Sequence, residues 1–284
     1  MSGQENLDEC YKVIEILVLE AGKVIAEAID KDKVTETKTI DYDMVTEYDR
    51  KVENTLVTSL ANKFPNHKFI GEESAAANGL TPNLTNDPTW IIDPIDGTTN
   101  FVHRFPQVCV SVALLIKKRA EIGIIYNPMM NQFFTARRGK GAFLNGKPIK
   151  TSSVQDLSLS LVAMEPWIAK EDPYRAHIYR RMDALIHQTH GIRSLGTAAL
   201  TLCYVAMGAV EAYHVESIEA WDVAAAQLII EEAGGIVIDT AGGELDLMKP
   251  RVIAACNRKL ACQLVELFNE ADTKPINVNL TRNC

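Results

Sequence analysis

Residues 89–101 read TWIIDPIDGTTNF and gather more chemistry than any other stretch of the chain. An apolar strand is predicted to end at Asp93, where Pro94 and Gly97 favour a tight turn. Asp93 and Asp96 are thereby left together at the carboxyl end of that strand. The DGTT that follows is typical of the start of a helix, whose free backbone amides bind anions. Carboxylates and a bound phosphate repel each other unless a cation lies between them, so this stretch predicts a hard-cation site for magnesium or manganese.

Several acidic residues at predicted element ends have both a structural and a functional interpretation. Glu72 and Glu73 follow a predicted strand, where adjacent acids are often surface charge. Asp222 and Asp49 each open a predicted helix, where an aspartate commonly caps the free amides. The 89–101 stretch has its own alternative, an N-capping Asp96 and an ordinary turn. Taken one at a time, these residues leave both interpretations open.

Helical and strand periodicities alternate along the rest of the chain. Apolar residues recur at helical spacing in residues 7–29 and 49–63. Residues 108–116 alternate at period two and residues 122–126 return from a charged turn, while Asn145-Gly146 predicts a two-residue hairpin. Further strands are predicted at 68–71, 89–93, 159–165, 191–195, 209–214 and 235–239, and further helices at 173–188, 197–207, 222–233 and 258–271. A loop is predicted between 71 and 89. Interleaved elements of this kind predict layered α and β structure with mixed sheets.

Composition excludes several function classes. The 284 residues include 29 Lys+Arg and 37 Asp+Glu, a net charge of −8, which argues against a nucleic-acid partner. No apolar run approaches the roughly 18–20 residues that span a bilayer, and residues 1–6 lack the pattern of a secretory signal. The six cysteines show no C-x-x-C spacing and are predicted to be reduced thiols. We expect a cytoplasmic protein with no membrane partner.

The residues of two other kinds of catalytic site are missing from the sequence. No cysteine has a C-x5-R context, and the six histidines show no H-E-x-x-H spacing, so each is predicted to be structural. The chain is predicted to form one catalytic domain with two lobes over residues 1–277. Residues 278–284 have little apolar content and are predicted to be a disordered tail.

Four strings together resemble the inositol monophosphatase family of magnesium-dependent, lithium-sensitive phosphatases. They are GEES at 71–74, the run at 90–106, GIRSLGTAA at 191–199 and WDVA at 221–224. Their order and spacing agree with the family from residue 7 to residue 271. The resemblance implies an α/β/α/β/α sandwich of the sugar phosphatase type, a homodimer, and a place in inositol phosphate metabolism and phosphatidylinositol signalling.

The resemblance also implies a role for each matching residue. Magnesium, or manganese as a substitute, would be held by Glu72, Asp93, Asp96, Asp222 and the carbonyl of Ile95. The amides of Gly97, Thr98 and Thr99 would cradle the phosphate, Thr98 and Glu72 would position the attacking water, and Asp49 would orient Thr98. Gly196, Thr197 and Ala198 would line the inositol pocket, Asp222 would also contact the substrate, Lys38 would lie at the mouth, and Arg193 would support its strand and the dimer contact.

One position departs from the family pattern. The family has an inositol-binding glutamate seven residues before the W-D aspartate, where this chain has Val215. Glu216 comes one place later, and it remains a candidate ligand if a bulge turns it inward. The implied reaction is hydrolysis of inositol monophosphates to myo-inositol and phosphate by a metal-activated water, without a covalent intermediate. Galactose 1-phosphate or fructose bisphosphate is an alternative substrate, and a non-catalytic scaffold is the alternative of a different class.

Overall fold

The structure is a computed structural model that describes residues 6–37 and 44–275. Lys38, the initial residues 1–5 and the predicted tail at 278–284 lie outside the described residues. Within the described part of the chain, no helix has both the length and the apolar content needed to cross a membrane.

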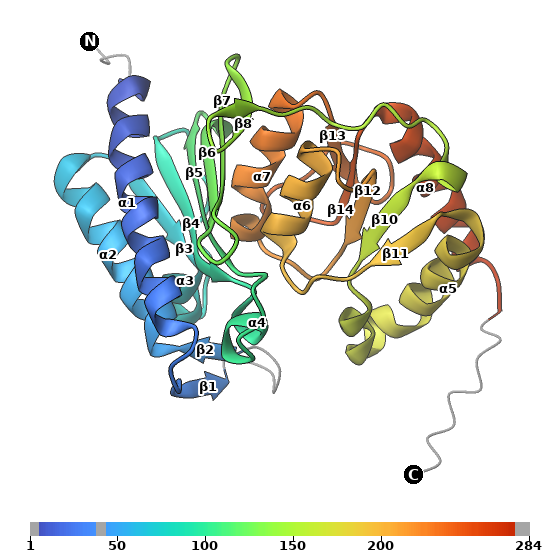
Figure 1. The fold of residues 1–284 in the computed structure, drawn as a ribbon, viewed down its shortest axis with the longest axis horizontal. Coiled ribbons are helices and arrows are strands. Elements are labelled where there is room, and N and C mark those ends of the chain that lie inside the picture. Colours follow the sequence, from blue (N-terminus) through green and yellow to red (C-terminus); the bar gives the residue numbers. More distant parts are fainter. Residues whose placement is uncertain (1–5, 38–43, 276–284) are drawn as a thin grey trace.

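A seven-stranded sheet forms the first half of the molecule, with helices on its outer face (Figure 1). Its strand order follows the chain, and β3 and β4 are parallel while all later neighbours are antiparallel. The outer helices are α1 (Leu7–Ala28) and α2 (Glu47–Lys63). The strands are β3 (Lys68–Gly71), β4 (Thr89–Asp96), β5 (Cys109–Ile116), β6 (Arg119–Asn127), β7 (Gln132–Arg137), β8 (Gly141–Leu144) and β9 (Lys147–Pro148).

A five-stranded mixed sheet forms the second half, in the order β11-β10-β12-β14-β13. Its strands are β10 (Leu161–Met164), β11 (Gly191–Arg193), β12 (Ala212–Val215), β13 (Ile236–Asp239) and β14 (Val252–Ala255). Helices α5 (Asp172–Gln188) and α8 (Arg258–Asp272) pack on its outer side, and α6 (Ala198–Ala206) and α7 (Ala220–Glu232) lie between the two sheets (Figure 1). The α/β/α/β/α sandwich that the resemblance implied is therefore confirmed.

Short elements join these layers around the site. They are β1 (Thr35–Thr37), β2 (Met44–Thr46), α3 (Glu72–Asn78), α4 (Thr98–Val102), and the 3-10 turns η1 (Leu157–Leu159) and η2 (Pro166–Lys170). The predicted hairpin is present, because β8 and β9 are joined by Asn145 and Gly146 alone, both at positive φ. The prediction of loop throughout 72–88 is wrong at its start, where residues 72–78 form α3. The strands β1, β2, β7 and β14 were not predicted.

Helix α7 is fixed along its length by the seven-stranded sheet. At Gly123 of β6 an added Cβ would lie 2.6 Å from the carbonyl oxygen of Ala225, so only glycine permits this approach of helix to strand. At the other end of the helix, Glu231 accepts a hydrogen bond from Arg138 at 2.6 Å, and Glu232 accepts from the backbone of the β7–β8 turn. The amino end of α7 points into the site described next.

Candidate active site

Strand β4 contains a bulge that turns two aspartates to the same face. Asp93 pairs with Ser111 and Asp96 with Cys109, so three steps along β4 match two steps along β5. In a regular strand, residues an odd number of positions apart point to opposite faces. The extra residue of the bulge brings Asp93 and Asp96 back to the same face, because two residues of β4 there lie opposite one residue of β5. Both carboxylates therefore lie on the side of the inner helices.

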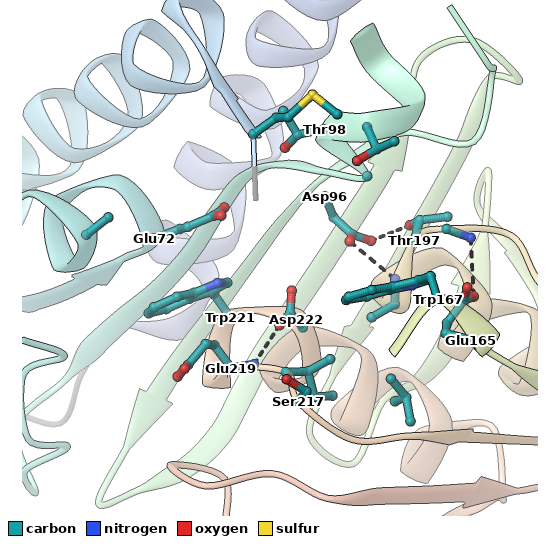
Figure 2. A pocket seen from close by; sticks show the side chains of 18 of the residues that line it. Glu72, Asp96, Thr98, Glu165, Trp167, Thr197, Ser217, Glu219, Trp221 and Asp222 are labelled. Carbon is teal, nitrogen blue, oxygen red and sulfur yellow. Dashed lines mark hydrogen bonds between the residues drawn. The ribbon is translucent and has the colours of Figure 1, made fainter. Parts of the chain in front are cut away.

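Asp222, in the first turn of α7, completes a group that we name, for the role that the resemblance implies, the catalytic carboxylates: Asp93, Asp96 and Asp222. One oxygen from each lies within 4.8 Å of the others. Figure 2 shows Glu72, Asp96 and Asp222 pointing toward a common space from three different elements. Asp222 also accepts a hydrogen bond from the backbone of Glu219 at 2.7 Å. The capping and the functional interpretations of Asp222 are thus compatible.

The electrostatics of the catalytic carboxylates favour a bound cation. Burial, followed by repulsion from neighbouring acids, raises the pKa of Asp93 and of Asp222 well above the ordinary value, and burial raises that of Asp96. Within the described ranges, no lysine or arginine forms a salt bridge with any of the three. The buried Oδ1 of Asp93 also lacks a hydrogen-bond partner among these residues. Such an oxygen-only donor set fits a hard divalent cation.

Asp96 is held by the amino end of α6. The hydroxyl of Thr197 and the amide of Ala199, the latter at 2.8 Å, donate to Oδ2, and the amide of Ala198 donates to Oδ1 at 3.2 Å. The Cys109 thiol lies 3.6 Å from Oδ2. Thr197 also lines the cavity described below, while its predicted contact with inositol stays a prediction.

Thr98 and Asp49 form a second polar pair beside the carboxylates. The Thr98 hydroxyl lies 3.2 Å from Oδ1 of Asp49 and 3.0 Å from the carbonyl oxygen of Ile95, so it can donate to either. Asp49 is fully buried in the first turn of α2, and its Oδ2 accepts hydrogen bonds from the backbone and side chain of Thr46. As with Asp222, the same side chain both caps a helix and faces the site.

Glu72 reaches the site because helix α3 starts at it, and a buried acid that the sequence analysis missed secures this start. Glu53 is 2% exposed and accepts from the amides of Glu73 and Ser74, each at 2.8 Å. An added Cβ at Gly71 would lie 2.6 Å from the Glu53 carboxyl carbon. One signal was available: Glu53 follows Asp49 by four positions, so both lie on one face of α2.

A cavity of about 700 Å³ opens over these groups. Of the predicted site residues, it is lined by Glu72, Asp96, Gly97, Thr98, Thr99, Gly196, Thr197, Ala198 and Asp222. Gly97, at φ +87°, allows the β4–α4 turn to pack closely, because an added Cβ would lie 2.8 Å from the carbonyl oxygen of Gln107. Two lining residues that the sequence analysis missed are Glu165 and Trp167, which Figure 2 shows beside Thr197.

Glu216 does not line the cavity, which corrects its prediction as a substrate contact. It is 4% exposed, and its Oε2 lies 2.7 Å from Nε2 of His177 and 3.3 Å from Nη1 of Arg181. The physical reason is strand phase: Val215 faces the cavity, so His214 and Glu216 on either side of it face the opposite way. No bulge turns Glu216 inward.

These groups belong to what we name the Arg181 network: Arg181, Glu216, Asp272, His177 and His214. Arg181 donates to Asp272 at 2.7 Å and lies 3.0 Å from Nε2 of His214. Burial acts to raise the pKa of Glu216, but the hydrogen bond from His177 and the charge of Arg181 outweigh it and lower this pKa to about 2. Burial and Arg181 lower the pKa of His214 to about 4.

Arg193 lies at the edge strand β11, away from the cavity. Its side chain is exposed, and Nη1 donates to the carbonyl of Ile192 at 2.9 Å. Its predicted part in a dimer contact stays a prediction, as does the role of Lys38, which lies outside the described residues.

Comparison with known proteins decides the family. A sequence profile described as "Inositol monophosphatase family" matches residues 6–273. The chain belongs to this family. It is 46% identical over 261 residues to inositol monophosphatase 2 of Homo sapiens, covering 91% of this chain and 90% of that protein. With human inositol monophosphatase 1 it shares 46% over 254 residues, covering 89% and 91%.

Solved structures of the family have the same fold. The extragenic suppressor protein suhB from Bartonella henselae superposes with a TM-score of 0.83 at 29% identity, covering 92% of this chain and 99% of that one. The Thermotoga maritima IMPase gives a TM-score of 0.82 at 30% identity, covering 94% and 98%. Membership identifies the chain as a metal-dependent phosphoric monoester hydrolase, and the acidic group of β4 and α7 can hold the metal.

Proposed function

We propose that this protein hydrolyses inositol monophosphates to myo-inositol and phosphate with Mg²⁺ as its cofactor, and that Mn²⁺ substitutes for it. The convergence of the three catalytic carboxylates beside the Thr98–Asp49 pair carries this proposal. The names of the human relatives support the choice of substrate. Glu72, Asp93, Asp96, Asp222 and the carbonyl of Ile95 would hold the metal. When bound, the metal supplies positive charge that activates a water and neutralises the leaving oxygen.

The remaining steps fall to groups of the chain. Thr98 Oγ1 would accept a hydrogen bond from the attacking water while its own hydrogen points to Asp49, and Glu72 would fix the water from the opposite side. Amides of Gly97, Thr98 and Thr99 would hold the phosphate, since the first amides of a helix have no partner within it. Water is the nucleophile in this scheme, so no covalent intermediate forms.

The experiment is release of phosphate from inositol 1-phosphate with and without Mg²⁺, comparing wild type with Asp93→Asn. We expect turnover that requires the cation and falls at least about 100-fold in the variant, because Asn keeps the size of the side chain but removes its charge. Turnover that is unchanged in Asp93→Asn would exclude the assigned site. Cation-dependent stabilisation without turnover of any phosphate ester would favour a scaffold.

One observation favours a broader substrate range. Val215 lines the cavity at the position where an inositol-binding glutamate is expected, and Glu216 is engaged in the Arg181 network. We therefore include galactose 1-phosphate and fructose bisphosphate as second candidates. A panel that compares kcat/KM for these esters and inositol 1-phosphate under one Mg²⁺ concentration separates the alternatives.

We further propose a cytoplasmic homodimer whose residues 1–277 form one two-lobed catalytic unit. The five cysteines in the described ranges are free thiols, which supports a reducing compartment. Kinship supports the dimer, and the edge position of Arg193 leaves it accessible for such a contact. Sedimentation of the purified protein tests the oligomeric state.

A further inference from the structure

The loop between β11 and α6 is held from two sides by residues that have no role in the scheme above. From one side, Glu165 accepts hydrogen bonds from the Ser194 hydroxyl at 2.9 Å and from the amides of Leu195 and Gly196 at 3.2 Å each. This glutamate is only 2% exposed. A buried carboxylate that satisfies three donors fixes the path of the loop strongly, because each of these hydrogen bonds involves a charge.

From the other side, Asn100 donates to the carbonyls of the same loop. Its Nδ2 lies 2.7 Å from the carbonyl oxygen of Leu195 and 3.2 Å from that of Gly196. The same nitrogen lies 2.8 Å from the carbonyl oxygen of Gln107, just before β5. Asn100 belongs to α4, in the half of the molecule built on the seven-stranded sheet, whereas the loop belongs to the half built on the five-stranded sheet. Its amide therefore ties the two halves together beside the site.

The contact between loop and amide leaves little freedom. Gly196 has φ +71°, and an added Cβ would lie 3.0 Å from Asn100 Oδ1. The next three residues of the chain, Thr197 to Ala199, are the donors that hold Asp96. Any displacement of the loop is thus passed directly to the hydrogen bonds on a catalytic carboxylate.

We infer that Asn100 and Glu165 are positioning residues that act as one clamp: they fix the 194–197 loop so that the amino end of α6 keeps Asp96 oriented for the divalent cation. Both residues line the cavity, but the side-chain hydrogen bonds described above go to this loop and to the carbonyl of Gln107. Outer hydrogen-bond partners of this kind typically contribute 10–100-fold to metal affinity or activity. The inference rests on the proposed function, because it concerns a ligand of the same cation.

The test compares Asn100→Asp and Glu165→Gln with wild type in two measurements. The first is the Mg²⁺ concentration at half-maximal phosphate release, with kcat measured at saturating Mg²⁺. The second is hydrogen exchange of the backbone amides of residues 195–199, measured without substrate.

Asn100→Asp replaces two donors with a carboxylate facing carbonyl oxygens, and we expect its half-saturating Mg²⁺ concentration to rise about 10–100-fold. Amide exchange in this segment is expected to accelerate about tenfold. Glu165→Gln keeps one acceptor and is expected to show a smaller change in the same direction.

Matched controls separate positioning from general destabilisation. Asn257→Ala removes another amide that donates to a loop carbonyl, that of Val154 at 2.7 Å, and also removes the cap of α8. Glu211→Gln alters another buried acid that accepts a backbone amide, at 2.7 Å. Both should lower the melting temperature and leave the half-saturating Mg²⁺ concentration within about twofold of wild type.

The outcomes are distinguishable. Wild type without Mg²⁺-dependent turnover would overturn the proposed function, while the exchange measurement would still test the clamp. Turnover in wild type with an unchanged Mg²⁺ requirement and unchanged amide exchange in Asn100→Asp would overturn the clamp alone. The double variant should show less than the sum of the two single effects, since both residues hold one loop; full additivity would contradict their action as one unit.

Discussion

The catalytic carboxylates and the Arg181 network are both groups of largely buried acids, yet within residues 6–37 and 44–275 only the acids of the Arg181 network are paired with a cationic side chain. In the network, Arg181 lies between Glu216 and Asp272, and the pKa of Glu216 falls to about 2. In the catalytic group, burial raises the pKa of Asp93 and Asp222 far above the ordinary value. The difference teaches that the Arg181 network obtains its positive charge from within the chain, whereas the catalytic carboxylates can receive theirs from a bound metal ion.

The largest effect is expected from breaking the completed group. Arg181→Met should lower the free energy of unfolding by about 3–5 kcal/mol, because it leaves the buried Glu216 without its cation and also removes the partner of the half-buried Asp272. Urea denaturation measures this loss. Arg180→Met, at the neighbouring position outside the network, is the matched control and should change stability by less than about 1 kcal/mol. An equal loss of unfolding free energy in the two variants would show that Arg181 contributes no more to stability than an arginine outside the network.

Acid should weaken the Arg181 network in two steps. The pKa of His214 is about 4 in the folded chain and 6.5 in the unfolded chain, and the pKa of Glu216 is about 2 in the folded chain and 4.5 in the unfolded chain. In both cases the unfolded state binds more protons, so stability falls between pH 6.5 and 4 and again between pH 4.5 and 2. Each step amounts to about 3 kcal/mol at most. Urea denaturation across this pH range checks it, and Glu216→Gln should lose the lower step while keeping the upper one.

The catalytic carboxylates should be stabilised by an added cation and, when no cation is bound, by the loss of one carboxylate. In wild type, Mg²⁺ at about 100 times its Kd should add about 2.7 kcal/mol to the free energy of unfolding. Asp93→Asn should lose this gain, but in EDTA it should unfold at a higher temperature than wild type, because it no longer buries an unpaired charge. Thermal unfolding with and without Mg²⁺ measures both. A variant that is less stable than wild type in EDTA would contradict the comparison.

The smallest effect is expected at Val215, which lines the cavity and directly precedes Glu216 of the Arg181 network. Val215→Glu would add a carboxylate to the cavity wall while Glu216 stays in the network. One added hydrogen bond is worth about 1 kcal/mol, so kcat/KM for inositol 1-phosphate relative to galactose 1-phosphate should rise about fivefold. The matched control Val215→Gln keeps the size and removes the charge. An unchanged ratio in both variants would show that Val215 does not face the substrate ring.

The sequence was sufficient to predict the layered fold and most of the residues that the structure brings together at the cavity, but not the positions of Glu216 and Arg193. The motif around Asp93 and the W-D pair at Asp222 carry strong local constraints, a strand end and a helix start, and these are visible without coordinates. The bulge that aligns Asp93 with Asp96 was not visible, because it depends on the register with β5. Helix α3 was missed because its seven residues are too few to show a period.

The supporting residues were harder to predict for a different reason. Glu53, Glu165 and Asn100 bond to backbone amides or carbonyls, which leave no trace in the residue types of their neighbours. For Glu53 the spacing from Asp49 was the one available signal. Glu216 shows the converse problem. Its residue type and nearly its position matched the expectation, but the phase of β12 turned it away from the cavity.

Gly123 has a consequence for how the protein distinguishes one cation from another. It lets α7 press against β6, and Asp222 projects from the first turn of that helix. A methyl group at this position would shift the helix, and Asp222 with it, so the distances between the carboxylates would change. If Asp222 binds the metal as proposed, the radius of the ion that fits the site would therefore depend partly on Gly123, which lies in β6 behind the helix.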